Sequence, residues 1–99
     1  MALLKAKALS EALATTPLWT RKGKTITRKF EFKDFPAAVR FVNRVAVIAE
    51  KAFHHPDIDI RWNKVTLALS THDEGGLTEK DFKLAVKCDA FVKPRKSSK

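Results

Sequence analysis

Three histidines are the residues of this sequence that are best suited to move a proton. His54 and His55 are adjacent, and His72 lies further along the chain. A histidine titrates near neutral pH, so it can donate or accept a proton without a large change in its pKa. All three follow a predicted helix or strand, where a rigid scaffold presents side chains to a ligand. The pattern is also typical of a helix end, where adjacent histidines interact with the last carbonyl groups and the helix dipole.

Metal binding and nucleophilic catalysis are the alternative uses of these residue types. Zinc would need several ligands at one point, but adjacent histidines rarely bind one ion, and the sequence contains no CxxC or HxxxH spacing. Cys88 falls on the apolar stripe of a predicted helix, which indicates a core position rather than a nucleophile. The Gly75-Gly76 pair lacks the spacing of a phosphate-binding loop. We therefore expect no metal site and no covalent intermediate.

A single small domain must hold the histidines in place, because the chain has only 99 residues. Apolar residues at helical spacing predict a first helix over residues 3–14. A hairpin is expected over residues 19–32, with its turn at Lys22-Gly23-Lys24. Asp34, followed two residues later by a proline, is typical of a helix start, and this helix should run from about 36 to 52.

Two more strands and a helix complete the predicted order. Residues 58–71 alternate as two strands with a bend at Asn63-Lys64. Thr78 and Asp81 have the spacing of a capping box, which indicates a last helix that ends near Phe91. The order α-β-β-α-β-β-α predicts an α+β two-layer domain, in which three helices pack on one face of a four-stranded antiparallel sheet.

The domain should cover residues 1–92 and leave residues 93–99 as a basic, mobile tail. The formal net charge is +9, from 20 Lys and Arg against 11 Asp and Glu. Phe30 and Phe32 fall on the apolar side of their strand, whereas sheet-face recognition of RNA needs exposed aromatics, so we do not expect a nucleic-acid partner. A surface of this charge can still attract an anionic small molecule.

The sequence also bears on the compartment. No apolar run approaches the roughly 20 residues that cross a bilayer, so no membrane segment is expected. The single cysteine fits a reducing environment. We expect a cytoplasmic protein, with the nucleus as an alternative.

One spacing pattern connects the histidines with residues elsewhere in the chain. Glu50 lies four positions before His54-His55-Pro56, Trp62 lies six after the proline, His72 lies ten after the tryptophan, and Asp81 follows. The pattern resembles the motif of the pterin-4a-carbinolamine dehydratase family, and the similarity extends over residues 19–91, including the run FEFKDF at 30–35. The chain departs from the family at Phe53, where many members carry Asp or Asn.

The resemblance implies a hydro-lyase that removes water from a 4a-hydroxytetrahydropterin. The product would be quinonoid dihydropterin, and the reaction would recycle the pterin cofactor of aromatic amino acid hydroxylases. His54 and His72 would form the acid/base pair, in an order that the sequence leaves open, and His55 would bind and orient the pterin. No metal or organic cofactor is implied.

Further site residues follow from the same resemblance. The expected substrate-binding residues are His55, Pro56, Glu50, Asp81 and Trp19. Glu50 or Asp81 would set the charge or tautomer of a histidine through a hydrogen bond. Asp81 is equally well explained as a helix-start residue. Trp62 shares the parity of the predicted strand residues Ile58 and Ile60, which favours a core position over stacking on the pterin.

Family members form oligomers, so a homodimer or homotetramer is expected. Phe82, Val86 and Phe91 give the last helix a wide apolar surface that is suited to subunit packing. Some animal members of the family also act as dimerisation cofactors for a homeodomain transcription factor. A transcription-factor or hydroxylase partner is therefore a second hypothesis beside the enzyme.

Overall fold

The computed structural model describes residues 3–92 and contains the predicted elements in the predicted order. The helices are α1 (Ala6–Ala14), α2 (Phe35–Ala52) and α3 (Glu79–Asp89). The strands are β1 (Thr20–Lys22), β2 (Thr25–Glu31), β3 (Asp57–Arg61) and β4 (Lys64–Leu69), and a short 3-10 helix, η1 (His72–Glu74), follows β4. The α+β class is confirmed. No helix within residues 3–92 has the length and hydropathy that crossing a membrane requires.

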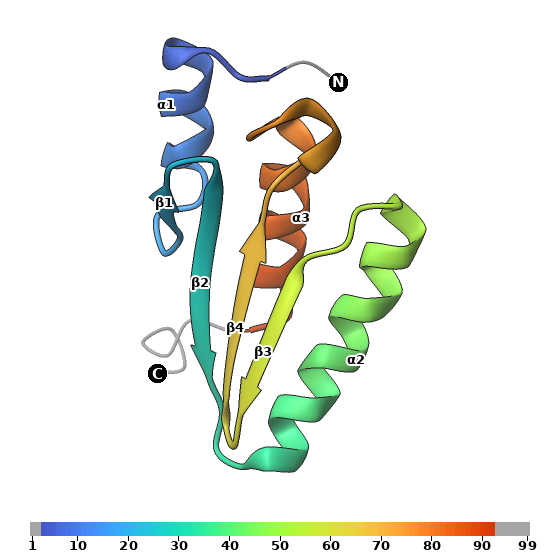
Figure 1. Cartoon of the computed structure of the whole chain (residues 1–99). Coiled ribbons are helices and arrows are strands. Elements are labelled where there is room, and N and C mark those ends of the chain that lie inside the picture. Colours follow the sequence, from blue (N-terminus) through green and yellow to red (C-terminus); the bar gives the residue numbers. More distant parts are fainter. Residues whose placement is uncertain (1–2, 93–99) are drawn as a thin grey trace.

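All four strands form one antiparallel sheet in the order β1-β2-β4-β3. The sheet therefore has β2 and β4 at its centre and β1 and β3 at its edges. Phe30 of β2 lies opposite Val65 of β4, and Val65 in turn lies opposite Ile60 of β3. Side chains on opposed residues share a face, so these three apolar residues point to the same side of the sheet. Figure 1 shows the sheet with α3 behind it and α2 running alongside.

The core lies between that face of the sheet and the helices. Strand β4 alternates strictly, because Val65, Leu67 and Leu69 are buried while the residues between them are partly exposed. Helix α2 contributes a buried stripe at helical spacing, namely Ala38, Phe41, Val45 and Ala49. Helix α3 adds Phe82, Leu84, Ala85 and Cys88. Helix α1 packs against the same cluster through its partly buried leucines Leu9 and Leu13.

Two helix starts have the caps that their sequences predict. The side chain of Asp34 accepts a hydrogen bond from the backbone N–H of Ala37, at 2.9 Å. At the start of α3, Thr78 and Asp81 form a complete capping box, in which each side chain accepts from a backbone amide of the other end of the box. These caps fix where α2 and α3 begin. His54 and His55 follow the end of α2, and the first turn of α3 contacts His54.

Several predicted boundaries were wrong by a few residues. Helix α1 begins at Ala6 rather than residue 3, and its N-cap residue Lys5 makes no side-chain capping bond. Helix α3 ends at Asp89, before Phe91. The two strands after α2 cover residues 57–61 and 64–69, so the turn lies at 62–63 instead of 63–64. Helix and strand ends are set by individual caps and turns that periodicity does not describe. The predicted tail, residues 93–99, lies outside the described residues.

The prediction that Trp62 is a core residue was wrong. Its side chain is 67% exposed, and its backbone is left-handed, with φ at 55°. The residue occupies the turn between β3 and β4, so the alternation of Ile58 and Ile60 ends before reaching it. The predicted apolar surface of α3 is also smaller than expected, because Phe82 is only 5% exposed and packs within the domain, while Val86 is exposed.

Candidate functional site

The end of α2 sends two adjacent histidines in opposite directions. Phe53 caps the helix with a left-handed backbone, at φ 52°, and its N–H bonds to the carbonyls of the last turn. The backbone N–H of His54 still reaches the carbonyl of Ala49, at 3.1 Å. After this reversal, the side chain of His54 is buried and that of His55 is exposed. Both precede Pro56, which stands before the first residue of β3.

The inward histidine is held by a buried carboxylate. Nε2 of His54 lies 2.6 Å from Oδ1 of Asp81, and the two residues are 8% and 0% exposed. Asp81 comes from the first turn of α3, so this bond joins the end of one helix to the start of another. A bond this short and this buried is typical of a charge-assisted hydrogen bond, which is stronger than a neutral one.

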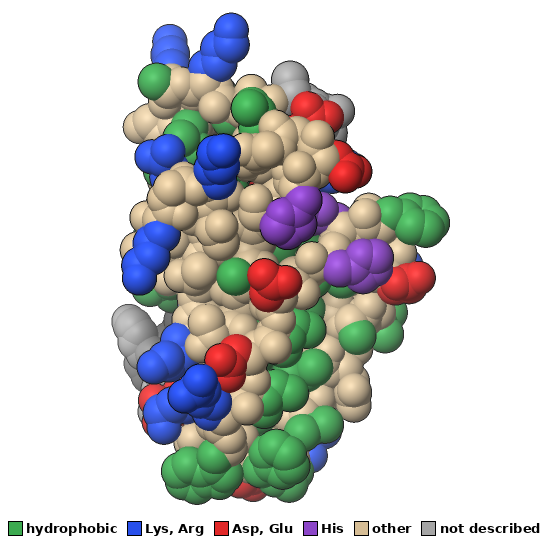
Figure 2. Space-filling view, viewed as in Figure 1, with side chains coloured by type: hydrophobic (Ala, Val, Ile, Leu, Met, Phe, Trp, Pro, Cys, Tyr) green, Lys and Arg blue, Asp and Glu red, His purple; other side chains and the backbone are tan. Residues whose placement is uncertain are grey.

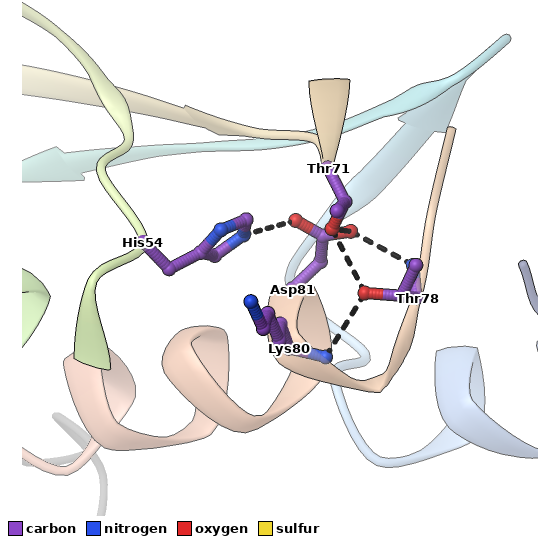
Figure 3. A network of polar contacts seen from close by, with 5 residues as sticks. All are labelled: His54, Thr71, Thr78, Lys80 and Asp81. Carbon is purple, nitrogen blue, oxygen red and sulfur yellow. Dashed lines mark hydrogen bonds and ion pairs between the residues drawn. The ribbon is translucent and has the colours of Figure 1, made fainter. Parts of the chain in front are cut away.

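Two threonines complete the environment of Asp81, as Figure 3 shows. Its second oxygen, Oδ2, accepts from the hydroxyl of Thr71 and from the backbone N–H of Thr78, both at 2.9 Å. The two hydroxyls are 2.8 Å apart, and that of Thr78 also accepts from the backbone N–H of Lys80. Thr71 gives its only hydrogen to Asp81, so the hydroxyl of Thr78 must donate to that of Thr71. The hydrogen bonds from Lys80 through Thr78 and Thr71 therefore all run in one direction, toward the carboxylate of Asp81.

This network assigns the proton on His54. An ionised carboxylate accepts hydrogen bonds and donates none, so Nε2 of His54 carries the hydrogen that faces Asp81. Within residues 3–92, the other ring nitrogen, Nδ1, has no hydrogen-bond partner. No buried side-chain nitrogen or oxygen in this part of the chain is unpaired. Nδ1 must therefore reach the surface, where it can accept a proton in the neutral ring or donate one in the charged ring.

The outward histidine has a different carboxylate. Nε2 of His55 lies 2.8 Å from Oε1 of Glu50, one turn back along α2. Both side chains are mostly exposed, at 62% and 74%. Such a pair orients the imidazole ring, but water screens it, so its contribution to stability is small.

His72 stands next to the same network through the backbone. It opens the 3-10 helix η1 directly after Thr71, the residue that donates to Asp81. Its side chain is exposed and makes no hydrogen bond within the described ranges. Thr71 itself is tied by backbone bonds to Gly75 and Gly76, which close the turn around η1. Figure 2 shows histidine side chains close together on the side of the molecule that is in view, beside acidic side chains.

A small pocket opens beside His54. It has a volume of about 110 Å³ and lies between the end of α2 and one face of α3. Its lining residues are Ala52, His54, Lys80, Lys83, Leu84 and Lys87. The buried histidine is thus reachable from a hollow as well as held by Asp81.

The structure joins, in separate pairs, several of the residues that the sequence singled out. His54 and Asp81 are in contact, His55 contacts Glu50, and His72 adjoins the Asp81 network. Trp19 is the exception. It is buried in the core, and its indole N–H donates to Asp89, about two turns further along α3 than Asp81. The structure therefore places Trp19 away from the histidines.

Sequence reasoning missed Thr71 as a partner of Asp81. Ten residues separate the two, and they meet only because η1 and its turn bring the start of α3 back to the end of β4. Thr78 was expected only as a helix cap. The capping-box spacing predicts the hydrogen bonds between Thr78 and the first turn of α3. It does not predict the hydrogen bond between the hydroxyls of Thr78 and Thr71.

Neither a metal ion nor a cysteine nucleophile is favoured by the geometry. Residues 3–92 contain no group of three His, Cys, Asp or Glu side chains that could hold a metal ion. Burial, and to a lesser extent the neighbouring charge of Asp89, raises the pKa of the Cys88 thiol from 9.0 to about 12. A thiol of that pKa is almost entirely protonated near neutral pH and is a poor nucleophile.

Comparisons with known proteins identify the family of the chain. The family described as Pterin 4 alpha carbinolamine dehydratase matches residues 2–91. A protein of Roseiflexus castenholzii is 54% identical over 91 residues, covering 92% of this chain and 98% of its own length. One of Acidobacterium capsulatum is 55% identical over 92 residues, covering 93% and 100%. Both names assign these proteins provisionally to pterin-4-alpha-carbinolamine dehydratase.

Two solved structures resemble the fold. One is a Brucella melitensis protein described as a transcriptional coactivator/pterin dehydratase, with a TM-score of 0.88 and 39% identity, covering 92% of this chain and 99% of that one. The other is a pterin dehydratase-like protein described as a RuBisCO assembly factor, with a TM-score of 0.62 and 22% identity over 73% of this chain and 83% of that one, which supports the fold alone. The family match and these identities show that the chain belongs to the pterin-4a-carbinolamine dehydratase family, whose members are hydro-lyases.

Proposed function

We propose that the protein dehydrates a 4a-hydroxytetrahydropterin to quinonoid dihydropterin, with His54 and His72 as the acid/base pair. The reaction would recycle the cofactor of pterin-dependent aromatic amino acid hydroxylases. The observation that carries the proposal is the 2.6 Å bond from His54 to Asp81, which fixes one ring nitrogen and leaves Nδ1 accessible. A histidine held in this way is prepared for proton transfer at a single atom.

The chemistry is an elimination across C4a and N5 of the pterin. The C4a–O bond breaks, and the departing hydroxyl takes a proton from a histidine and leaves as water. The proton on N5 passes to a second histidine, and the electron pair of the N–H bond forms the C4a=N5 double bond. Each positioned proton transfer typically accelerates such a step by about 10²–10⁴-fold.

Asp81 supports this role of His54 electrostatically. When Nδ1 takes up a proton, the ring becomes an imidazolium that faces an ionised carboxylate on its Nε2 side. Oδ2 of Asp81 already accepts from Thr71 and Thr78, so Oδ1 is positioned to accept from Nε2 and to stabilise the charged ring. Asp81 is then a positioning residue, and His54 is the group that contacts the substrate.

His55, Pro56 and Glu50 are proposed to bind the pterin beside this pair. The Glu50 contact orients the exposed ring of His55, which makes His55 suited to hydrogen-bond with polar edges of the substrate. Pterin rings carry several hydrogen-bond donors and acceptors, so an imidazole ring held in one direction would favour one orientation of the bound pterin. Trp19 is not part of the proposed site, because its indole is committed to Asp89 in the core.

The edge strand β3 supports the proposal of a homo-oligomer. Every residue of β3 is exposed, including Ile58 and Ile60, and among residues 3–92 the strand pairs only with β4. An exposed apolar edge strand is a template for pairing with another chain. Antiparallel pairing of two copies about Asp59 would set Asp57 of one copy opposite Arg61 of the other, which is a favourable charge pair.

A regulatory partner is the second candidate function. The Brucella relative is described as a transcriptional coactivator as well as a pterin dehydratase. The similarity covers nearly the whole chain, and the description of the relative names both roles. We therefore propose a protein partner in addition to catalysis and not in place of it. We also propose a cytoplasmic location, with the nucleus as the alternative, because the recycling role would require access to the hydroxylases.

A turnover assay tests the enzyme proposal. A 4a-hydroxytetrahydropterin is generated in situ by a pterin-dependent hydroxylase, and its decay is followed by ultraviolet absorbance with and without the purified protein. We expect the protein to accelerate this decay in proportion to its concentration. Decay at the buffer rate would reject the proposal.

A further inference from the structure

The pocket beside His54 combines an apolar wall with a concentration of positive charge. Ala52 ends α2 on one side, and Leu84 belongs to α3 on the other. Lys80, Lys83 and Lys87 complete the lining. Their spacing of three and four residues places the lysines on one face of α3. Figure 3 shows that the side chain of Lys80 extends along the helix toward the ring of His54.

The positive charge of this pocket is hardly neutralised. No acidic residue is among its lining residues. Lys83 lies 4.0 Å from Glu79, but both side chains are well exposed, and such a pair interacts weakly. Among residues 3–92, neither Lys80 nor Lys87 forms an ion pair. Three ammonium groups are therefore available to a ligand.

The shape of the pocket limits what that ligand can be. The methylene stems of lysines cover apolar surface while their ammonium groups stay in water, so the charges lie at the rim and the wall below is apolar. A volume of about 110 Å³ is small. Since one water occupies about 30 Å³ in the liquid, the pocket has room for a group of a few heavy atoms. A carboxylate or phosphate on a short apolar linker meets both requirements.

We propose that this pocket is an anion subsite that holds a carboxylate or phosphate on the C6 substituent of the pterin substrate. The inference rests on the proposed function, because it takes His54 as the point where the ring is held. His54 lines the pocket, so a substrate at this histidine has the subsite next to it. The preferred substrates would then be pterins with an anionic side chain, rather than those with a neutral one.

Equilibrium binding tests this without catalysis. The probes are two fluorescent, unreactive pterins, pterin-6-carboxylate and 6-methylpterin, titrated with the full chain. We expect the carboxylate to bind about fivefold more tightly at low ionic strength, and the preference to shrink as salt screens the lysines. In the K83Q/K87Q variant the ratio of the two affinities should approach one. Both lysines are exposed, so the fold should tolerate these changes.

A matched control removes the same charge elsewhere. Lys22 and Lys24 are exposed in the hairpin of β1 and β2, at the opposite edge of the sheet from β3. The K22Q/K24Q variant should keep the preference for the carboxylate. An equal loss in both double variants would overturn the subsite, because it would show only an effect of net charge. The absence of any preference in the unaltered protein would overturn it as well.

Two further measurements separate the alternatives. Sodium phosphate that displaces pterin-6-carboxylate better than sodium acetate of equal ionic strength would identify phosphate as the favoured anion, whereas the reverse order would identify the carboxylate. If the binding preference holds but the protein does not accelerate dehydration, the proposed function fails and the subsite stands. If dehydration occurs without a preference, only the subsite fails.

Discussion

Nε2 of His54 and Oδ1 of Asp81 lie 2.6 Å apart in the interior of the domain, at the junction of two helix ends. His54 follows the C-terminus of α2, and Asp81 lies in the first turn of α3. The carboxylate thus has two tasks. It completes the capping box of α3 and it holds the ring of His54. Stability and the proposed proton transfer are therefore coupled at this residue.

Replacement of His54 or His72 tests the acid/base pair. We expect His54→Gln and His72→Ala each to lower the rate of dehydration at least tenfold, because each removes one proton-transfer group. Glutamine at 54 can still donate to Asp81, so the buried carboxylate keeps a partner. Circular dichroism should show an unchanged fold for both variants. A fully active His72→Ala protein would remove His72 from the mechanism.

The Asp81→Asn variant tests the tautomer of His54. Its amide oxygen can accept from Thr71 and Thr78, and its NH₂ group then faces Nε2, which must become an acceptor. The hydrogen moves to Nδ1, and we expect the rate to fall at least tenfold. Nitrogen NMR of the imidazole ring should report the exchanged tautomer.

Glu79→Gln is the matched control for Asp81→Asn, because Glu79 is an exposed acid in the same first turn. It should leave the rate and the tautomer unchanged. Both variants lose a negative charge near a helix N-terminus, so each should lose about 0.3–1 kcal/mol of stability from that cause. A rate loss of the same size in the control would mean that the charge, and not the bond to His54, is responsible.

Phe53 is held in a conformation that suits it poorly. Its φ of 52° is left-handed, which costs a residue with a β-carbon about 1–2 kcal/mol, and its side chain is 80% exposed, so packing returns little. Asparagine and glycine adopt this conformation more readily. We expect Phe53→Asn to raise the free energy of unfolding by about 0.5–1 kcal/mol in urea denaturation. Phe53→Ala, which keeps the β-carbon, should not stabilise the protein.

The sequence predicted the fold well, because the apolar periods of its helices and strands are regular. It predicted Trp62 poorly, because counting parity assumes that a strand continues, and a left-handed residue in a turn ends it. The opposite exposures of His54 and His55 were equally hidden. They follow from the backbone reversal at Phe53, and nothing in the side chain of phenylalanine indicates such a conformation.

Contacts within the candidate site were predictable only where the two residues are near in sequence or belong to one motif. The pairing of Thr78 with Asp81 follows from local spacing. The contact of Asp81 with Thr71 depends on the turn around η1, and the pocket depends on how α2 packs against α3. Contacts of this kind are set by tertiary packing, which a pattern along the chain does not encode.

Cys88 should react only when the protein unfolds. At pH 8, a thiol whose pKa is about 12 is ionised to roughly one part in 10⁴, and burial also blocks access. We expect a disulfide reagent to modify the native protein slowly and the urea-unfolded protein at the ordinary rate. Fast modification of the native state would contradict the buried position.

The same pKa has a consequence at high pH. Below about pH 9 the thiol is protonated in both states and has no effect. Between pH 9 and 12 the unfolded chain loses the proton while the folded chain keeps it, so stability falls as the pH rises. Cys88→Ala should weaken this fall, and the difference in slope between the two proteins isolates the thiol, because the two chains are otherwise identical. Equal slopes would show that the thiol does not contribute.

The subunit interface can be located by adding charge to one surface at a time. Ile58 and Ile60 are exposed on the edge strand β3, and Val86 is exposed on α3. If copies pair through β3, Ile58→Lys combined with Ile60→Lys should shift the protein toward monomer in sedimentation, since it places like charges across the interface. Val86→Lys should not. The reverse result would return the interface to α3, where the sequence first suggested it, although Phe82 is occupied within the domain. Dehydration rates of the two variants would then show whether the proposed site needs the oligomer.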